Sequence, residues 1–530
     1  MNSKGYLAIV LHAHLPYVRH PEHEDFLEED WLYEAITETY LPLIDVFNSL
    51  LEDNVPFRIT LSLSPTLISM LQDSLLQDRY VRHLDRLIEL TDREKHRTQS
   101  QTEFHSLASF YHDRFRHNQE VFVSRYKKNL ITAFAQLHQS GSVELITCGA
   151  THSYFPLLES YPSSVKAQLQ VGLDCFQKAF GFRTKGFWLP ECGFHFEQEK
   201  LLHEAGIEYT FVDSHGILFA TPRPRYGIFA PCYTPSSVAV FGRDPETSRS
   251  VWSSKEGYPG DPIYREFYRD IGFDLDYDYM RPYINGDGTR TATGVKYYRI
   301  TGETDQKEPY QRQWALSRAA EHAGNFMFNR EKQIEHLYQK MGRPPIIVAP
   351  YDAELLGHWW FEGPEWLNFL FRKIAFDQTV FETITPSEYL QKFKKNQVLM
   401  PSLSSWGWKG YSEVWLNGSN DWIYRHLHKM SERMTLLARE YGHAYSDVLV
   451  RRTLNQMARE LLLAQSSDWA FILKTGTFIE YARRRLREHI GRFQNLYEQV
   501  QSRCIDENYL SHLESIDNVF SDINYQVYAT

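Results

Sequence analysis

Two acidic side chains follow short apolar runs, where a carboxylate without a partner would be energetically costly. Glu191 lies in WLPECGF after the run 185–189, and Asp352 lies in PYDAELLGHWW after the run 345–351. Acids in such positions are either paired or used in catalysis. Two carboxyl groups that face one sugar are the minimum equipment for cleaving a glycosidic bond, because one attacks carbon and the other protonates the leaving oxygen. The pattern alone leaves a structural salt bridge or hydrogen bond open, and other carboxylates compete for these roles: Glu354, Asp213 and Glu159.

The sequence HAHLP places His12 and His14 at alternate positions, so both side chains point to the same face of a strand end. Such a pair could share a metal ion, but a zinc hydrolase is expected to supply a third histidine or a carboxylate close by. The residues that follow are Leu15, Pro16 and Tyr17. Hydrogen bonding to a polar substrate or to the catalytic carboxylates is therefore favoured, and metal binding or a buried structural role remain alternatives. We expect no metal ion and no cofactor.

Several tryptophans lie beside glycine, proline or charged residues and not within a smooth helical periodicity. Indole rings offer flat apolar faces, which suit stacking against sugar rings. Trp406 and Trp415, in SSWGWKGYSEVWLNG, are predicted to contact a sugar, and capping of the barrel against a helical domain is the alternative. The full set is Trp31, Trp188, Trp252, Trp359, Trp360, Trp406, Trp408 and Trp415.

Short β-rich apolar runs recur along the chain, and each is followed by polar residues and then by a helix-like pattern. This order is typical of βα units and a parallel sheet. A closed barrel is favoured over an open doubly wound sheet, because the polar residues after the runs would then meet at one rim, where the catalytic groups of barrels gather. The runs lie at residues 6–12, 57–64, 143–147, 185–189, 209–213, 238–242 and 345–351, with 379–384 as a candidate extra.

The strand pattern is interrupted twice and ends before the C-terminus. Residues 74–130 are charged and helically periodic, which predicts a helical insertion. Residues 218–300 are rich in turn-forming residues, and a stretch of this length beside a rim indicates a lid-like loop. We therefore predict an α/β barrel built from residues 1–73 and 131–400, followed by a C-terminal α-helical domain at residues 401–530.

Composition excludes several classes of protein. The net charge of −10 argues against a nucleic-acid partner, which requires a basic face. No apolar stretch is long enough to cross a membrane, and the first residues, MNSKGYLAIVLHAH, hold an apolar run too short for a secretory signal, so we expect a cytoplasmic protein without membrane contact. Five widely spaced cysteines are interpreted as reduced thiols. The motifs of phosphate loops, serine esterases and Rossmann cofactor sites do not occur.

Five ordered motifs give the sequence a resemblance to a known family. HAHLPYVRHP at the start, CGATHSYFPLL at 148–158, FWLPECG at 187–193, PYDAELLGHWW at 350–360 and SSDWAF at 466–471 resemble the motifs of glycoside hydrolase family 57, and within it those of the α-glucan branching enzymes. The resemblance covers nearly the whole chain. It implies a distorted, TIM-like (β/α)7 barrel that carries the helical insertion and the C-terminal helical domain.

The resemblance also implies a mechanism and its residues. Glu191 would be the nucleophile and Asp352 the general acid/base of a retaining reaction on α-glucan, without a metal ion. Retention places the two carboxyl groups about 5–5.5 Å apart, whereas inversion requires about 6.5–9.5 Å. The residues expected to contact the glucan are His12, His14, Trp31, His152, Tyr233, Arg265, Trp359, Trp360, Trp406, Trp415 and Asp468, with Tyr233 of PCYTPSS covering the cleft.

The expected reaction is cleavage of α-1,4 bonds and transfer of the chain to a 6-hydroxyl, so that α-1,6 branches form on an amylose-like or glycogen-like partner. The sequence departs from the family pattern at Thr477 of KTGT and at FHFEQE after ECG, which bears on acceptor binding. The alternatives are a 4-α-glucanotransferase or α-amylase of the same family, a zinc-dependent hydrolase, and a non-catalytic glucan-binding protein. We expect a monomer or a weak homo-oligomer.

Overall fold

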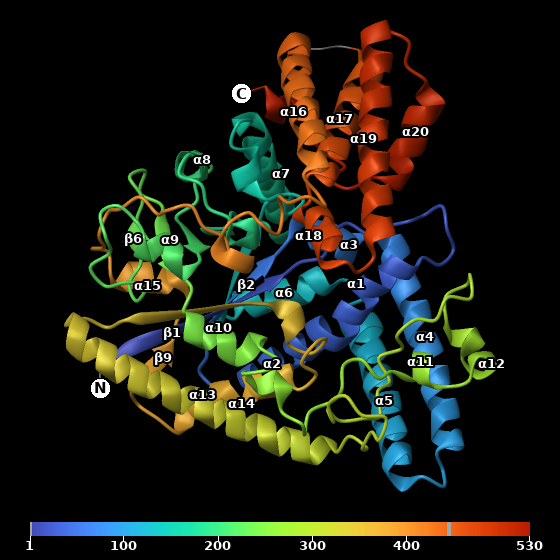
Figure 1. Cartoon of the computed structure of the whole chain (residues 1–530), viewed down its shortest axis with the longest axis vertical. Helices are drawn as coiled ribbons and strands as arrows, with labels where there is room; N and C mark the ends of the chain where they lie inside the picture. Colours follow the sequence, from blue (N-terminus) through green and yellow to red (C-terminus); the bar gives the residue numbers. More distant parts are fainter. Residues whose placement is uncertain (1–2, 443–446, 530) are drawn as a thin grey trace.

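The computed structural model describes residues 3–442 and 447–529, and its centre is a curved sheet (Figure 1). The strands follow the order β6-β7-β5-β4-β3-β2-β1-β8, and β9 pairs with β1 off this path. All neighbouring pairs are parallel except β6 with β7. The strands are β1 Gly5–Ala13, β2 Ile59–Leu63, β3 Val143–Cys148, β4 Gly186–Trp188, β5 Tyr209–Val212, β6 Cys232–Tyr233, β7 Ala239–Gly242, β8 Ile346–Asp352 and β9 Phe381–Thr383.

The two edges of the parallel sheet meet. The backbone nitrogen of Asp244, just after β7, donates to the oxygen of Val348 in β8 at 2.9 Å. Seven parallel strands therefore curve into a barrel-like wall, and an open doubly wound sheet is ruled out. The predicted barrel fold with a C-terminal helical domain is confirmed. The extra run at 379–384 forms β9, which pairs with the first residues of β1.

Alternate residues of each strand face opposite sides of this wall, because the side-chain period of a strand is two. In β1, residues 6, 8 and 10 pack inside the barrel, whereas residues 7, 9 and 11 pack in the larger core that includes the surrounding helices. Both faces of β1 are buried, as is usual for parallel strands. His12 continues the inward series of β1, and Asp352 continues that of β8, so both side chains reach the inner rim.

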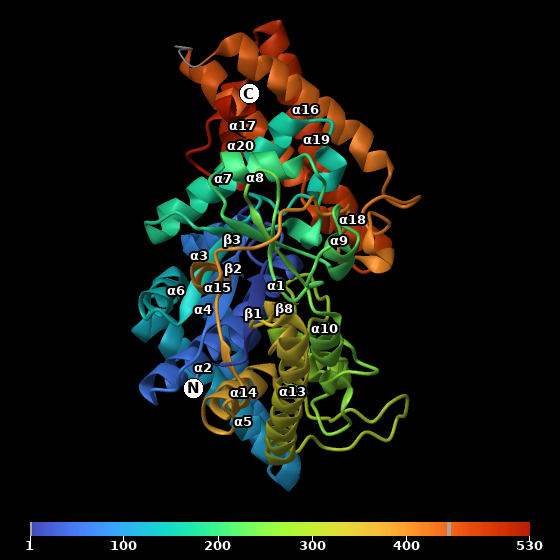
Figure 2. The same ribbon diagram turned by 90° about the vertical axis from the view of Figure 1, so that its left-hand side faces the viewer.

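Helices cover the outer face of the barrel (Figures 1 and 2). Helix α7 illustrates how the sequence sets the limits of these helices. It begins with Pro162 at its first position, and it is capped after Phe180 by Gly181, whose φ of 79° is left-handed. The covering helices are α2 Leu41–Glu52, α3 Pro65–Gln72, α6 Leu130–Gln139, α7 Pro162–Phe180, α13 Arg312–Met341, α14 Gly363–Phe376 and α15 Pro386–Lys392.

The segment 74–130 contains two long helices that lie side by side, α4 Ser74–Arg97 and α5 Thr102–Gln119 (Figure 1). The segment 218–300 is not one loop, because it contains β6, β7, α10 Pro245–Trp252, α11 Ile271–Asp274 and α12 Tyr277–Met280. Its later part is fastened to α4, since Tyr279 Oη and Tyr297 Oη each donate to the buried Glu94 carboxylate at 2.8 Å. The lid role of this segment stays a prediction.

Five helices follow the barrel in sequence and rise from one end of it (Figures 1 and 2). They are α16 Trp422–Tyr441, α17 Val448–Ala464, α18 Ser467–Thr475, α19 Ile479–Ser502 and α20 Glu507–Ile516. Helix α18 lies where this group meets the barrel. The division into domains at residues 74, 131 and 401 stays a prediction, and its outer limits at residues 1 and 530 lie outside the described residues.

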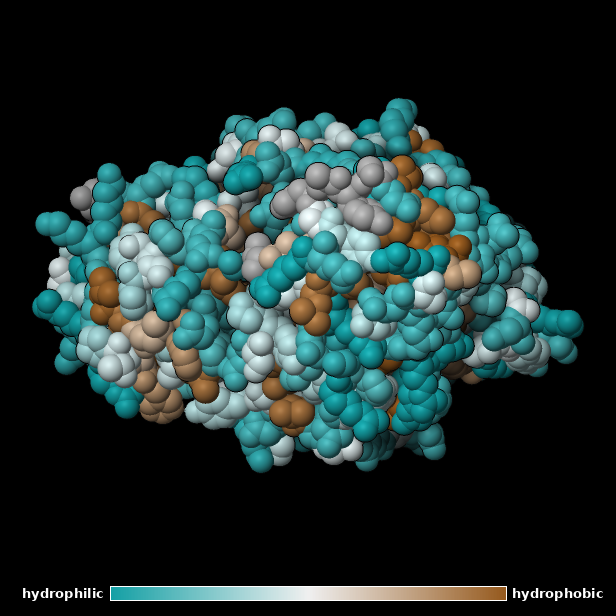
Figure 3. Space-filling view, turned by 90° about the horizontal axis from the view of Figure 1, so that it is seen from above, coloured by the Kyte–Doolittle hydropathy of each residue, from teal (hydrophilic) through white to brown (hydrophobic). Residues whose placement is uncertain are grey.

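Within residues 3–442 and 447–529, no helix combines the length and apolar character that a membrane crossing requires. Seen from the end that carries the C-terminal helices, the surface is mainly hydrophilic with small hydrophobic patches (Figure 3). The cysteines are all free, and three of the five are buried.

Two helical glycines provide a matched test of the packing between helix and barrel. A Cβ at Gly172 of α7 would lie 2.5 Å from the backbone oxygen of Cys148 in β3, whereas a Cβ at Gly491 of α19 would meet nothing within 4 Å. Gly172→Ala should lower the free energy of unfolding by about 1–3 kcal/mol, because backbone must shift to admit the methyl group. Gly491→Ala should raise it by about 0.5–1 kcal/mol through helix propensity. Denaturant unfolding of both variants checks this, and equal effects would contradict the close approach of α7 to β3.

Candidate active site

Glu191 lies in a tight turn, η5 Pro190–Cys192, that directly follows β4. Its φ is 61° and that of Cys192 is 50°, so two consecutive non-glycine residues adopt the left-handed region. Each such residue costs on the order of 1–3 kcal/mol, and strain of this kind gathers at functional sites. The backbone of Trp406 holds the turn, because its nitrogen donates to the Glu191 carbonyl oxygen at 3.0 Å. The strain is what aims the carboxylate across the rim.

Two donors fix the carboxylate of Glu191. Trp406 Nε1 donates to Oε2 at 2.8 Å, and Ser467 Oγ donates to Oε1 at 2.9 Å. Burial raises the pKa of Glu191, and the two hydrogen bonds oppose that rise because they stabilise the ionised form. The side chain is therefore fixed in the orientation that a nucleophile needs. Ser467 belongs to α18, so the C-terminal helices complete the surroundings of a barrel residue.

Asp352 ends β8 and lies in register with His12 of β1. Burial and then the nearby Glu191 carboxylate raise its pKa to about 7, although the positive charges of His14 and Arg243 oppose the shift. Among the described residues, no side chain donates a hydrogen bond to its carboxyl group. Since Glu191 has two donors and Asp352 has none, the proton that the pair holds near neutral pH rests on Asp352.

Three histidines form a stack beside the two acids. The ring centroids of His14 and His152 lie 3.8 Å apart, and those of His12 and His152 lie 5.0 Å apart. His12 contacts Ser62 Oγ through Nδ1 and His152 Nε2 through Nε2, each at 3.0 Å. Burial and the neighbouring rings lower the pKa of His12 and of His152 well below the ordinary value. These two rings are therefore neutral at pH 7.

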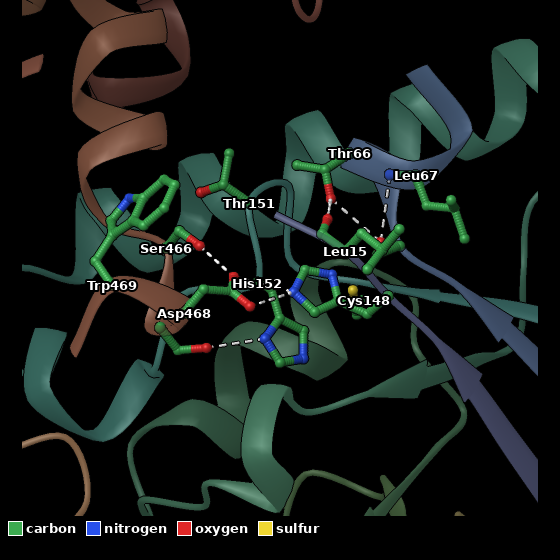
Figure 4. Close-up of polar contacts among 12 residues, drawn as sticks. Leu15, Thr66, Leu67, Cys148, Thr151, His152, Ser466, Asp468 and Trp469 are labelled. Atoms are coloured by element: carbon green, nitrogen blue, oxygen red, sulfur yellow. Dashed lines mark hydrogen bonds and ion pairs between the residues drawn. The ribbon is translucent and has the colours of Figure 1, made fainter. Parts of the chain in front are cut away.

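His14 differs from the other two rings because its pKa is raised and not lowered. Burial alone would lower its pKa, but Asp468 at 3.0 Å from its Nε2 outweighs burial and raises that pKa. Burial alone would likewise raise the pKa of Asp468, and the His14 charge reverses this and lowers it to about 2. Figure 4 shows Asp468 and Ser466 at the start of α18 facing His152 from the loop after β3. Ser466 Oγ also donates to Asp468, so the C-terminal helices fix the carboxylate that pairs with His14.

The three competing carboxylates are each occupied by other partners. Glu354 accepts from Tyr40 Oη at 2.5 Å and from the backbone nitrogen of His14 at 3.2 Å. Asp213 pairs with Arg243 at 3.2 Å, and Glu159 pairs with His195. Glu191 and Asp352 remain as two rim acids close enough for the Glu191 charge to raise the pKa of Asp352. The described neighbours of the rim thus support the sequence-based assignment.

Four residues expected to contact the glucan have other partners or positions in this structure. Tyr233 lies in register with Ala239 at the start of β7, the end of the strand opposite to the rim. Arg265 is buried against the Phe361 ring and pairs with Glu38 at 3.1 Å. Trp360 and Trp415 are only 2% and 1% exposed. Glucan contact by these four residues stays a prediction.

Trp415 instead fits the alternative of capping the barrel. Its ring stacks on Tyr154 at 4.3 Å, and its backbone oxygen accepts from Tyr424 Oη of α16 at 2.6 Å. Trp31 and Trp359 are half-buried, and Trp31 packs edge-on against Phe478 at 5.2 Å. Sugar contact by Trp31 and Trp359 stays a prediction.

Ser467 and Tyr40 were missed from the sequence. Ser467 precedes Asp468 in SSDWAF, and that motif could have suggested it, because the N-terminus of a helix presents adjacent hydroxyl and carboxylate groups to one side. Tyr40 has no local signal, since it lies within a helix whose sequence, AITETYLPLI, reads as ordinary core.

The metal alternative has a geometric basis. Ligand atoms of His14, His152 and Asp468 lie within 4.8 Å of one another. In the present arrangement the same atoms serve other contacts, because His14 is paired with Asp468 and His152 contacts Ser467 and His12. The expectation that no metal is bound stays a prediction.

The barrel and the pair of carboxyl groups at its rim define a protein equipped for glycosidic-bond chemistry. The sequence model of glycosyl hydrolase family 57 matches residues 8–401, and that of the C-terminal region of 1,4-alpha-glucan branching enzyme matches residues 426–528. The chain belongs to glycosyl hydrolase family 57. The family resemblance drawn from the five motifs is confirmed.

Known proteins resemble the chain over nearly its full length. A 1,4-alpha-glucan branching enzyme of Thermococcus kodakarensis is 33% identical over 98% of this chain and 78% of its own length. Among solved structures, an alpha-amylase of Thermotoga maritima is 46% identical with a TM-score of 0.93, and the match covers 99% of both chains. A branching enzyme of Pyrococcus horikoshii is 33% identical with a TM-score of 0.87, over 99% of this chain and 97% of that one.

Asp352→Asn tests the assignment of the proton. The folded-state pKa of about 7 lies above the ordinary 3.8. Between these two pH values the folded protein keeps this proton, whereas the unfolded chain has released it. The wild type should therefore lose stability as pH rises from about 4 to 7, and the variant should not share this contribution. The difference in unfolding free energy, variant minus wild type, should therefore be about 2–4 kcal/mol larger at pH 7 than at pH 4.

Denaturant unfolding at several pH values measures this difference, and activity provides a second readout. The wild-type rate should fall as pH rises through about 7, because Asp352 then loses the proton that it must donate. A stability difference that does not change with pH would contradict the assignment. The Asp352 charge is one cause of the raised pKa of Glu354, so part of the pH-dependent difference between the two proteins comes from Glu354.

Ser467→Ala tests the contribution of α18 to the nucleophile. A hydrogen bond to a charged group contributes roughly 1.5–3 kcal/mol, so kcat should fall on the order of ten- to a hundredfold. The lost donor should also raise the pKa of Glu191 further and shift the acidic limb of the rate profile to higher pH. Thr475→Ala, at the exposed end of the same helix, is the control and should change neither quantity. A loss of activity without a shift of the acidic limb would point to a merely structural role.

Proposed function

We propose that the protein is a 1,4-α-glucan branching enzyme, which cleaves α-1,4 bonds with retention and transfers the released chain to a 6-hydroxyl. The observation that carries this proposal is that the C-terminal region supplies side chains to the site. Residues 426–528 match the C-terminal region of branching enzymes, and this region supplies Ser467 to the nucleophile and Asp468 to the histidine stack. The C-terminal region that matches branching enzymes thus contacts both residues of the proposed reaction centre that lie in the barrel, Glu191 and His14.

The first half of the reaction follows from the two acids. Glu191 attacks the anomeric carbon of an internal glucose unit, and the bond from that carbon to the leaving O4 breaks while Asp352 gives its proton to that oxygen. The product is a glucosyl ester on Glu191 and a free 4-hydroxyl. Trp406 and Ser467 hold the attacking carboxylate in place, which keeps the reacting atoms aligned.

The second half decides between branching and hydrolysis. Asp352, now ionised, takes the proton of an incoming hydroxyl, the new bond forms at the anomeric carbon, and the ester to Glu191 breaks. A glucan 6-hydroxyl gives an α-1,6 branch, and water gives hydrolysis. Two inversions at one carbon retain the α configuration. Exclusion of water and capture of the acceptor chain therefore set the product.

The histidine stack suits the donor sugar. His12 and His152 are neutral and can donate and accept hydrogen bonds, whereas His14 carries a charge that Asp468 balances. We assign these residues to the hydroxyl groups of the glucose unit at the cleaved bond. The alternative of a zinc-dependent hydrolase uses the same side chains, and stoichiometric metal in the purified protein would be its sign.

One observation favours a second candidate function. The solved structure with 46% identity is an alpha-amylase of Thermotoga maritima, so hydrolysis by water is the strongest alternative to transfer. A 4-α-glucanotransferase would share both acids but form only α-1,4 bonds. A glucan-binding protein without turnover is the remaining alternative. We further propose a cytoplasmic protein that acts on amylose-like or glycogen-like chains, without nucleic acid, as a monomer or weak homo-oligomer.

Incubation with amylose separates these functions. Branching lowers iodine staining and creates α-1,6 signals in proton NMR with little gain in reducing ends, because each cleaved bond is replaced by a new one. Hydrolysis gives reducing ends in proportion to the bonds cleaved. The proposal predicts the first pattern, and equal reducing ends and cleaved bonds would contradict it.

Glu191→Gln should abolish this reaction, with a fall of at least about a thousandfold, while glucan binding and the fold persist. The amide keeps the size of the side chain but is a poor nucleophile. Circular dichroism and maltoheptaose binding serve as controls for the fold and the cleft. Substantial turnover by the variant would show that another residue attacks the sugar.

A further inference from the structure

A second groove lies beside the rim, next to the catalytic acids. It is an open depression of about 430 Å³ between the residues that follow β5 and helix α10 with the turn after it. Its lining includes Asp213, Ser214, Arg243, Ser248, Trp252 and Glu256. The reaction described above does not use this groove, and Trp252 belongs to the set of tryptophans whose sequence surroundings suit stacking against sugar rings.

Arg243 lines the groove and also lies near the two acids. The guanidinium carbon of Arg243 lies 5.4 Å from the centre of the Trp406 ring, and that indole donates to Glu191. The positive charge of Arg243 is also close enough to oppose the rise in the pKa of Asp352. A glucan chain that extends from the two acids past Trp406 would therefore meet Arg243 at the edge of this groove.

Trp252 stands at the C-terminal end of α10 with 61% of its surface exposed. Within the described residues, neither an aromatic ring nor a cation covers its indole. An uncovered indole loses little conformational entropy on binding and offers a wide, flat apolar face to a ligand. Trp252 lies in a groove that is otherwise lined mainly by hydroxyl and charged groups. This combination is typical of a site for sugar rings, because these rings are apolar on their faces and polar at their edges.

Two ion pairs occupy four of the five charged side chains that line the groove, and Lys255 is the fifth. Arg243 pairs with Asp213 at 3.2 Å and donates to Ser248 Oγ at 2.7 Å, and Arg249 lies 3.7 Å from Glu256. A charged ligand that contacts either pair would have to compete with the partner already present. A neutral ligand rich in hydroxyl groups can instead share the hydrogen-bonding capacity of both pairs. The two pairs therefore favour a neutral polyhydroxyl chain.

We infer that this groove is an outer binding subsite for an α-glucan chain, with Trp252 as the stacking platform that holds glucose units remote from the cleaved bond. The inference rests on the proposed function and adds a determinant of chain length to it. Interactions far from the reacting bond can be used to align the reacting atoms, so long chains gain rate from this subsite and short ones do not.

The test compares Trp252→Ala with Trp314→Ala. Trp314 of α13 is also 61% exposed but does not line the groove, so it controls for the loss of a surface indole. With amylose, Trp252→Ala should lower kcat/KM roughly tenfold, whereas Trp314→Ala should leave it unchanged. With maltotriose, which is too short to span both places, both variants should match the wild type. Trp252→Phe should recover part of the loss, because a ring remains.

A binding readout separates this inference from the proposed function. In the Glu191→Gln background, calorimetry with maltoheptaose should show several-fold weaker binding when Trp252 is also replaced by alanine. Equal affinity with and without Trp252 would overturn the subsite, whichever reaction the enzyme catalyses. An equal loss of rate on amylose and maltotriose would also overturn it. Absence of maltoheptaose binding in both proteins would overturn the proposed function and the subsite with it.

Discussion

The site depends on the burial of two carboxyl groups beside each other at one rim. Neither acid can be ionised there without cost, and their mutual repulsion raises the cost further. The surroundings resolve this conflict by unequal hydrogen bonding: Trp406 and Ser467 donate to Glu191, and no described side chain donates to Asp352. This difference suits the proposed roles, in which Glu191 attacks and Asp352 gives a proton. The chemical roles follow from this asymmetry and not from the identity of the residues.

This asymmetry is built from both parts of the chain. The barrel supplies the acids, because the period of two in its strands directs Asp352 and His12 inward and the strained turn after β4 aims Glu191. The C-terminal helices supply Ser467 and Asp468, and the backbone nitrogen of Ser467 donates to the His152 oxygen at 3.1 Å. Separation of α18 from the rim would remove a donor from the nucleophile and the counter-charge of the histidine stack together.

The sequence predicted the strands well, because both faces of most strands are buried and the runs are continuous and apolar. It also predicted that Glu191, Asp352 and the histidines would meet at one rim. It could not predict contacts that depend on packing between distant segments. Nothing local distinguishes Trp415, which caps the barrel, from Trp406, which donates to Glu191. The position of Tyr233 could not be predicted either, because a short antiparallel strand, β6, carries it to the start of β7.

The most direct test of the account is to trap the covalent intermediate. In a 5-fluoro-glucosyl fluoride the ring fluorine slows both steps, but the fluoride leaving group speeds formation of the ester. The ester therefore accumulates, and mass spectrometry of the digested protein can locate the sugar. The account predicts one added glucosyl group, on the peptide that contains Glu191. A label on Asp352 or on another carboxylate, or the absence of any covalent adduct during turnover, would contradict it.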